Sequence, residues 1–227
     1  MQRSFWFMCA TFGVLTVAAC LAEDGELWSA QEKGKAIPTS LMEVEKLGEH
    51  SYDEVKSQLW DKAGSTFISL QTAAKKLPDD VKLSDADKKR LDTELTNLEK
   101  ALNAKNRAAG MRAANQITLI GADLVEPFGP NVPADVTRLD HYGRELEIWV
   151  EAKDLGKLKS TTSAIRKCWD KLQPAVKARS GEAEAKRFSA LVAQAERAKT
   201  VEDFGKVFTP ILDEVDNLEG VFKKAKN

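Results

Sequence analysis

The sequence predicts an all-α protein, and three observations carry that prediction. Ala, Leu, Lys and Glu are prominent among the 227 residues, and these residue types favour helices. Apolar residues return every three or four positions along most of the chain, which is the spacing of one helix face. No segment alternates apolar and polar residues for long enough to form a strand. We therefore expect amphipathic helices joined by short connections.

Composition and charge exclude two broad classes of protein. Hydrophobic residues make up 43% of the chain, which is enough for a packed core and excludes an intrinsically disordered protein. The chain has 34 Lys and Arg against 35 Asp and Glu, so its formal charge is −1. This balance excludes a broadly basic protein, and we expect no nucleic-acid partner.

The first 22 residues have the pattern of a secretory signal peptide. Arg3 gives a short positive start, and an apolar run follows from Phe5 to Ala19. This run is shorter than the roughly 20 residues that a transmembrane helix needs. We therefore expect residues 1–22 to direct export and to be removed.

Two cleavage positions compete. The stretch Val-Ala-Ala-Cys that ends at Cys20 resembles the bacterial lipobox, which predicts cleavage before Cys20 and a lipid anchor on its thiol. Leu21 after this cysteine predicts sorting to the outer membrane of a bacterium with two membranes. Alternatively, Cys20 and Ala22 are the small residues that an ordinary signal peptidase needs, which predicts a soluble periplasmic protein. A cysteine at the end of the apolar run favours lipidation.

Residues 23–37 are polar and are expected to be a tether, and the helices follow it. Proline is well suited to the first turn of a helix, and Ser-x-x-Glu is a capping box that marks a helix start. These signals predict one helix from Pro38 to about Leu47, a second after Ser51-Tyr-Asp-Glu54 and up to Pro78, a third from Ser84 to a break near Asn103, and a fourth up to Pro127.

The second half of the chain repeats the plan of the first. The two copies span residues 38–128 and 132–226, and equivalent positions lie 94 to 109 residues apart. The matching groups are Ile37-Pro38 with Val132-Pro133, Trp60-Asp61-Lys62 with Trp169-Asp170-Lys171, Lys89-Arg90 with Lys186-Arg187, and Ile117, Leu124 and Phe128 with Ile211, Leu218 and Phe222. The predicted fold is a tandem of two up-down-up-down four-helix bundles. A single extended helical array remains the alternative.

One stretch of the second copy resembles a known family. Residues 146–154, followed by Lys157, Ile165-Arg166 and Trp169, are similar to the first hairpin of the soluble four-helix cytochromes, both b-type and c-prime. The resemblance covers about 90 residues and implies a four-helix bundle with a haem. The haem ligands are not matched, since the chain has no Cys-x-x-Cys-His motif and no His in the helices expected at 104–126 and 201–224.

Motifs of catalysis and of nucleotide binding are absent from the sequence. There is no Gly-x-x-x-x-Gly-Lys-Ser/Thr, no Gly-x-Gly-x-x-Gly, no His-Glu-x-x-His and no Gly-x-Ser-x-Gly. The chain has two His, and export would leave Cys168 as the only free thiol, because Cys20 would be either lipidated or removed. Few residues are therefore available for a serine- or cysteine-based catalytic triad. We expect a protein that is not an enzyme, with Cys168 buried as a small apolar residue rather than reactive.

The two histidines are the candidates for a metal site. His50 is followed by Glu54 and His141 by Glu145, and residues four apart share one helix face. The candidate metal site is Asp123, His141 and Glu145, because Asp123 would face His141 if the helices on both sides of residues 127–133 pack antiparallel. The alternative is that these are ordinary helix residues.

The aromatic residues at helical spacing are expected to form the core. The alternative is that some of them form the wall of a small-ligand pocket. Gly143 in the middle of a helix is expected to mark either a close approach of two helices or an aperture between them. Together these observations predict an exported, lipid-anchored bundle that acts as a non-catalytic binding or assembly module of the bacterial envelope, with an envelope protein as partner and no cofactor. The alternative function is a periplasmic carrier of a small ligand, a divalent metal or haem.

Overall fold

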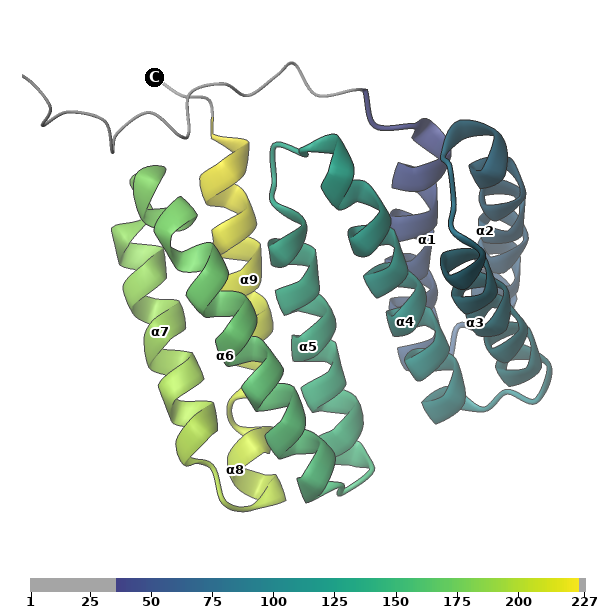
Figure 1. Ribbon diagram of the computed structural model, residues 1–227. Coiled ribbons are helices and arrows are strands. Elements are labelled where there is room, and N and C mark those ends of the chain that lie inside the picture. Colours follow the sequence, from purple (N-terminus) through teal and green to yellow (C-terminus); the bar gives the residue numbers. More distant parts are fainter. Residues whose placement is uncertain (1–35, 225–227) are drawn as a thin grey trace, which may run out of the picture. The chain divides into compact units, whose positions relative to one another are not determined.

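The computed structural model describes residues 36–224, and within them it contains helices and no strand, which confirms the all-α prediction (Figure 1). The predicted signal peptide, Cys20 and nearly all of the predicted tether lie outside these residues. The helices are α1 (Thr39–Lys56), α2 (Trp60–Asp80), α3 (Asp85–Asn103), α4 (Arg107–Val125), α5 (Ala134–Glu151), α6 (Leu155–Ala178), α7 (Glu182–Arg197), α8 (Val201–Gly205) and α9 (Phe208–Lys223), with a 3₁₀ turn at Glu126–Phe128.

Side chains that accept hydrogen bonds begin several helices, as the sequence predicts. The Ser84 hydroxyl accepts from the Asp87 amide at the start of α3, and Thr200 and Asp203 form a complete capping box at the start of α8. Asn106 caps α4 after the break that follows Asn103. Each cap satisfies a backbone donor that has no partner within the helix, and so fixes where the helix begins.

The expected capping box at Ser51 is wrong. Helix α1 does not end near Leu47 but continues to Lys56, and both Ser51 and Glu54 are buried in its interior. The apolar spacing carries on through Gly48 to Val55, and Gly48 lies against α4. The burial of one continuous face therefore prevails over a local signal for a helix start.

Two prolines, Pro78 and Pro210, affect where helices end or begin. Pro78 lies inside the last turn of α2, which ends two residues later at Asp80. The last helix, expected to be continuous over residues 201–224, is divided into α8 and α9 at Lys206 and Val207. Pro210 explains the division, because it has no N–H for the carbonyl of Lys206 and its ring would clash with that carbonyl.

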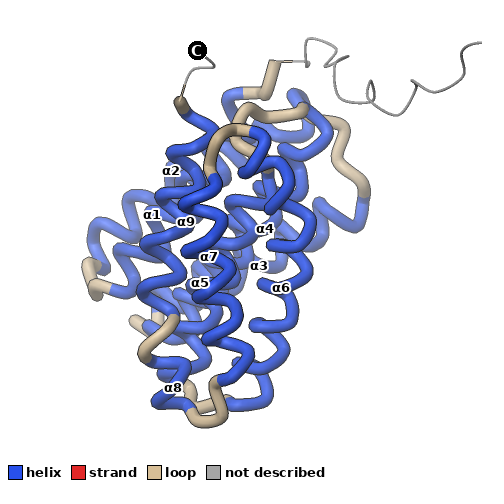
Figure 2. Tube along the Cα trace, turned by 90° about the vertical axis from the view of Figure 1, so that its left-hand side faces the viewer, coloured by secondary structure: helices blue, strands red, loops and turns tan. Residues whose placement is uncertain are grey.

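The helices pack in two groups, each around its own hydrophobic cluster. In the first group α1 packs on α2 and α4, and α3 packs on α4. In the second group α5 packs on α6 and α9, and α7 packs on the other side of the same two helices. Helices α4 and α5 also pack against each other, and Trp149 of α5 contacts both clusters. Figures 1 and 2 show the long helices running roughly side by side.

The first helices of the two groups share several local features. Both α1 and α5 have 18 residues and follow a proline that adopts an extended conformation. Both are followed by a residue in the left-handed region, Gln58 and Lys153, with φ of 57° and 55°. Each helix also places a glycine against the last helix of its group: Gly48 lies on Thr118 of α4, and Gly143 lies on Leu212 of α9. The expected close approach at Gly143 is confirmed.

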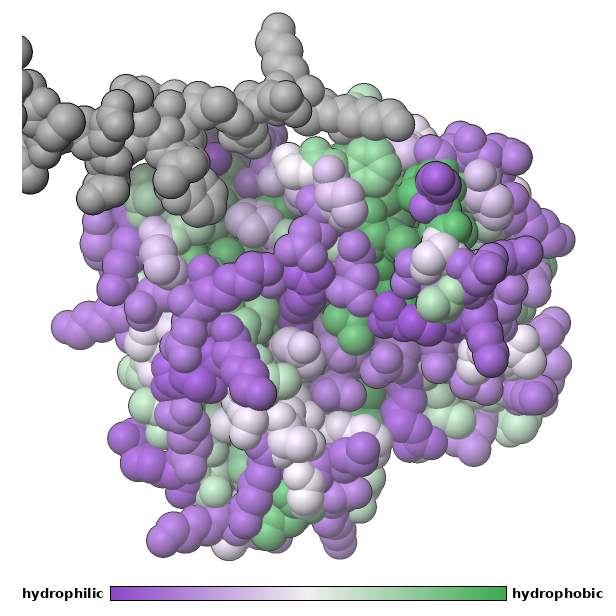
Figure 3. Space-filling view, viewed as in Figure 1, coloured by the Kyte–Doolittle hydropathy of each residue, from purple (hydrophilic) through white to green (hydrophobic). Residues whose placement is uncertain are grey.

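Hydrophilic residues cover most of the face seen in Figure 3, and hydrophobic residues show between them. None of the described helices has the length and apolarity that crossing a membrane requires.

Candidate functional site: a cavity between two helix pairs

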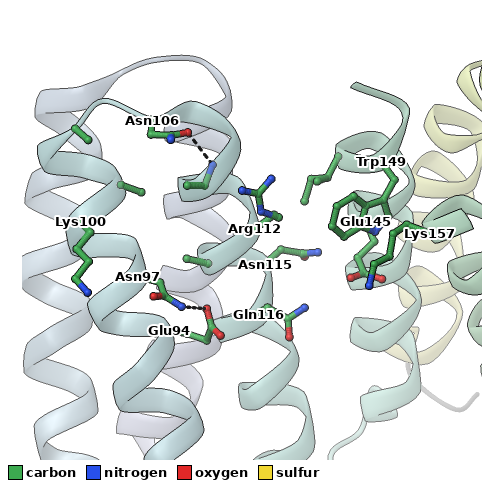
Figure 4. Close-up of a pocket in the computed structure, with 15 residues that line it drawn as sticks. Glu94, Asn97, Lys100, Asn106, Arg112, Asn115, Gln116, Glu145, Trp149 and Lys157 are labelled. Carbon is green, nitrogen blue, oxygen red and sulfur yellow. Dashed lines mark hydrogen bonds between the residues drawn. The ribbon is translucent and has the colours of Figure 1, made fainter. Parts of the chain in front are cut away.

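A cavity of about 670 Å³ lies where the pair α3–α4 faces the pair α5–α6 (Figure 4). Its size falls within the range of about 300–1,000 Å³ that is usual for small-ligand pockets. The wall combines amide, charged, aromatic and small apolar side chains. The polar and aromatic ones are Glu94, Asn97, Lys100, Asn106, Arg112, Asn115, Gln116, Glu145, Trp149 and Lys157.

Helix α4 supplies one wall because it lies between three other helices. It packs on α1, α3 and α5, and its buried residues therefore lie on nearly every face. A polar side chain at a buried position of such a helix needs a hydrogen-bond partner or another reason to be there. Asn115 is such a side chain, and its exposed fraction is 1%. In Figure 4 it projects from α4 toward α5.

Two buried polar atoms in the wall of this cavity have no hydrogen-bond partner among the described residues. They are the side-chain oxygen of Asn115, Oδ1, and the indole nitrogen of Trp149, Nε1. Leaving a buried polar atom unpaired costs about 1–3 kcal/mol. One atom is an acceptor and the other a donor, and they come from α4 and α5, so both walls of the cavity hold an unpaired polar atom.

Asn115 and His141 join α4 to α5 through a reciprocal pair of hydrogen bonds. The Asn115 side-chain amide donates to the backbone carbonyl of His141, at 3.0 Å. The Nδ1 of His141 lies 3.0 Å from the backbone carbonyl of Asn115 and must donate to it, because that oxygen is only an acceptor. Burial lowers the pKa of His141 to about 4. The ring is therefore neutral at pH 7, and its Nε2 carries a lone pair.

Glu145 brings a carboxylate to the same wall. Its Oε2 accepts from the hydroxyl of Thr161 at 3.1 Å, whereas its Oε1 lies 4.0 Å from Nε2 of His141. Glu145 Oε1 and His141 Nε2 are both acceptors, so no hydrogen bond joins them. Burial raises the pKa of Glu145, partly offset by the Thr161 bond and by the charge of Lys157. This carboxylate is thus partly desolvated without a donor on one oxygen.

Cationic side chains lie on both walls. The ammonium of Lys157 lies 5.6 Å from the centre of the Trp149 ring, within the range of a cation–π contact. Arg112 of α4 is exposed and forms no ion pair with any described residue. Figure 4 shows Arg112 on the wall opposite Trp149 and Lys157. The cavity therefore offers positive charge beside the acceptors described above.

The structure brings together two of the three residues predicted to bind a metal. His141 and Glu145 face each other on α5, as their spacing predicts. Asp123 instead forms ion pairs with Arg90 and Arg138, each at 3.1 Å. No group of three or more His, Cys, Asp or Glu side chains within residues 36–224 has the geometry of a metal site. Of the other pair, His50 is exposed, and Glu54 is buried beside Lys62.

Cys168 is buried on α6, as predicted from its place in a helical pattern. Its thiol donates to the backbone carbonyl of Asp135 at 3.3 Å. Burial, together with the charge of Asp135, raises the pKa of the thiol to about 12. A thiol that stays protonated at pH 7 is a poor nucleophile, so this geometry favours a structural cysteine.

A second cavity, of about 310 Å³, lies between α1, α5 and α9 and is strongly acidic. Its carboxylates are Glu45, Glu49, Asp140, Asp216 and Glu219, and its cations are Lys46 and Arg144. Burial and neighbouring carboxylates raise the pKa of Glu49 to about 7, and burial raises that of Asp140 to about 6, although Arg144 opposes both shifts. Burial is the largest cause of both shifts, so these carboxyl groups are costly to ionise where α1, α5 and α9 meet.

Comparisons with protein-family models, with characterised proteins and with solved structures find no match to this chain. The cavity must therefore be interpreted from its own chemistry. Trp149 is one of the aromatic residues at helical spacing for which the sequence predicts a place in the core or, alternatively, in a pocket wall, whereas no sequence pattern predicted Asn115 or Arg112. The available signal was a polar Asn next to the apolar and small residues Ala113, Ala114 and Ile117 of the same helix.

Proposed function

We propose that this chain is a non-catalytic binding protein of the bacterial envelope and that the cavity between α3–α4 and α5–α6 holds a small ligand. One observation carries the proposal: an unpaired acceptor, Asn115 Oδ1, and an unpaired donor, Trp149 Nε1, line the same cavity. Native proteins rarely leave buried polar atoms unsatisfied, and an unpaired acceptor and an unpaired donor in the wall of one cavity favour a group bound there.

Placement of the cavity between two groups of helices supports this function. In the proposed tandem arrangement each copy is a four-helix bundle, and the site forms where the copies meet. The matched starts and ends of α1 and α5, and their equivalent glycines at 48 and 143, support a duplication. Sites between domains are frequent in binding proteins, because a ligand can contact two rigid surfaces at once.

Export and a lipid anchor are part of the same proposal. The apolar run and the Cys20 that follows it support secretion and lipidation. A lipid on Cys20 would hold the helices at a membrane surface of the envelope, where an envelope protein is the expected partner. Cells supplied with radiolabelled palmitate should label the wild type, while Cys20→Ala should remain unlabelled. A wild type without label would remove the anchor and leave a soluble periplasmic protein.

The binding site can be tested by filling the cavity. Ala109 is partly buried in its wall, so Ala109→Trp should occupy the space, whereas Ala190→Trp places the same side chain on the exposed face of α7. We expect at least one compound in a panel of small polar metabolites to raise the melting temperature of the wild type and of the control. At a hundredfold excess over Kd the gain is about 2.7 kcal/mol, or about 5–10 °C for a chain of this size.

The cavity-filled variant should show no such rise. If every stabilising compound acts equally on Ala109→Trp, or if none stabilises the wild type, this cavity is not the binding site. An absorption spectrum and a metal analysis of the purified protein address the alternative of a haem or metal carrier. A Soret band, or metal in stoichiometric amount, would favour that alternative.

A further inference from the structure

We propose that the ligand of this cavity is a small zwitterion with a free ammonium group and a free carboxylate, of the size of a dipeptide. The inference rests on the proposed function, because it takes the cavity between α3–α4 and α5–α6 as the binding site. It adds the chemical class of the ligand, which follows from the hydrogen-bonding groups that the cavity leaves without partners.

The acceptors of the cavity call for an ammonium group. Asn115 Oδ1 has no donor, and Glu145 Oε1, which lies 4.0 Å from the unprotonated Nε2 of His141, accepts no hydrogen bond from a described residue. An ammonium group carries three N–H donors and no acceptor, so it can serve several such atoms at once. Its charge would also compensate the partly desolvated carboxylate of Glu145, and it can lie against the face of Trp149.

The donors of the cavity call for a carboxylate. Trp149 Nε1 is a buried donor without an acceptor, and Lys157 lies beside the same ring. On the opposite wall, Arg112 is free of ion pairs among the described residues. A carboxylate accepts several hydrogen bonds and pairs well with guanidinium and ammonium groups.

A neutral polyhydroxylated ligand fits these groups less well. Its hydroxyls could pair with Asn115 Oδ1 and Trp149 Nε1, but they would bring no charge to the partly desolvated carboxylate of Glu145, which Lys157 offsets only in part. Enclosing an uncompensated charge is unfavourable. The amides of Asn97 and Gln116 are suited to the peptide group of a dipeptide, because each offers both a donor and an acceptor.

Three closely matched probes separate the two charges. Glycylglycine has both, N-acetylglycylglycine lacks the ammonium, and glycylglycinamide lacks the carboxylate. Binding is followed by nuclear magnetic resonance through the indole N–H signal of Trp149, which Trp149→Phe identifies. We expect glycylglycine to shift this signal in a saturable manner. Removal of either charge should raise Kd at least tenfold.

Substitutions connect each charge to its wall. Glu145→Gln keeps the shape and the Thr161 contact, and it should weaken glycylglycine at least tenfold while changing little for the acetylated probe. Glu99→Gln, on the exposed face of α3, is the matched control and should bind as the wild type does. Arg112→Gln should weaken glycylglycine and change little for the amidated probe.

Equal Kd values for all three probes, or equal binding by wild type and Glu145→Gln, would overturn the assignment of a zwitterion. So would the absence of any shift with glycylglycine. If other compounds still stabilise the wild type and not Ala109→Trp, the cavity remains a binding site and only the ligand class is wrong. If no compound does so, the proposed function fails as well.

Discussion

Individual glycines set how closely the helices approach one another. A Cβ added at Gly121 of α4 would lie 2.9 Å from Cβ and 3.0 Å from Cα of Glu45 on α1, and neither atom can move without its backbone. At Gly64 of α2 an added Cβ would meet nothing within 4 Å. The same substitution therefore has opposite consequences at two helical positions.

We predict that Gly121→Ala destabilises the protein by about 1–3 kcal/mol through overpacking. Gly64→Ala should stabilise it by up to about 1 kcal/mol, because Ala favours the helix over Gly and has open space there. Thermal unfolding measures both, at about 2–4 °C per kcal/mol. A neutral or stabilising effect of Gly121→Ala would show that α1 and α4 do not approach as closely as described.

Glu49 gives the acidic cleft a dependence on pH. Its pKa is raised to about 7 from the usual 4.5, so the folded protein binds a proton there at pH values where the unfolded chain does not. The stability associated with this group is present below about pH 4.5 and is lost as pH rises through 7. His141 acts in the opposite direction, since its pKa is lowered to about 4 and stability rises with pH between 4 and 6.5.

Because the two groups oppose each other, a substitution at Glu49 isolates its effect. We predict that Glu49→Gln melts at a higher temperature than the wild type at pH 8, by a few degrees, corresponding to about 1 kcal/mol. At pH 5 the two should be about equal, because the wild-type carboxyl is then protonated. Glu43→Gln on the exposed face of α1 is the control and should show no such pH dependence. A constant difference between wild type and Glu49→Gln across pH would contradict the raised pKa.

At the scale of elements, α4 and α5 form the seam that positions the cavity. The reciprocal hydrogen bonds of Asn115 and His141 hold the two helices together. Tyr52 of α1 adds a further link by donating to the carboxylate of Glu147 on α5 at 2.8 Å, and Lys56 pairs with the same carboxylate. The walls of the cavity are therefore fixed by buried polar contacts as well as by apolar packing.

We predict that His141→Leu lowers the free energy of unfolding by about 1–3 kcal/mol, because it removes one of these bonds and disturbs its partner. His50→Leu, at an exposed position, should have little effect. The loss should be the same with zinc or with a chelator present. A zinc-dependent rise in melting temperature that disappears in His141→Leu would instead support the metal site suggested by the sequence.

Sequence patterns predicted elements best where one signal dominated. Ser84 begins a helix as expected, and Thr200 caps α8, which starts at residue 201, where a helix was also expected. Ser51 has the same local signature, but tertiary packing of α1 on α4 keeps it in a helix interior. The cavity was harder to predict, because it depends on which faces of α4 and α5 meet, and no periodicity within one helix contains that information.

At the scale of the whole molecule, the described helices form one compact unit with two hydrophobic clusters. The buried residues of the second cluster all lie within residues 136–222, and the first four helices contribute none of them. We predict that residues 132–227 alone fold into a helical domain with cooperative unfolding, though with lower stability than the full chain because Ile148 and Trp149 lose contacts with the first cluster. Circular dichroism during thermal unfolding checks this, and a disordered spectrum would show that the two groups depend on a shared core.

The central claim is that the cavity between α3–α4 and α5–α6 is occupied by a small ligand in the functioning protein. Native mass spectrometry of the mature chain, isolated gently from its own cells, tests this directly. The account predicts a second species heavier than the apo chain by one small molecule, present in the wild type and in Ala190→Trp but absent from Ala109→Trp. A single apo mass in all three proteins, or an adduct equally abundant in Ala109→Trp, would contradict it.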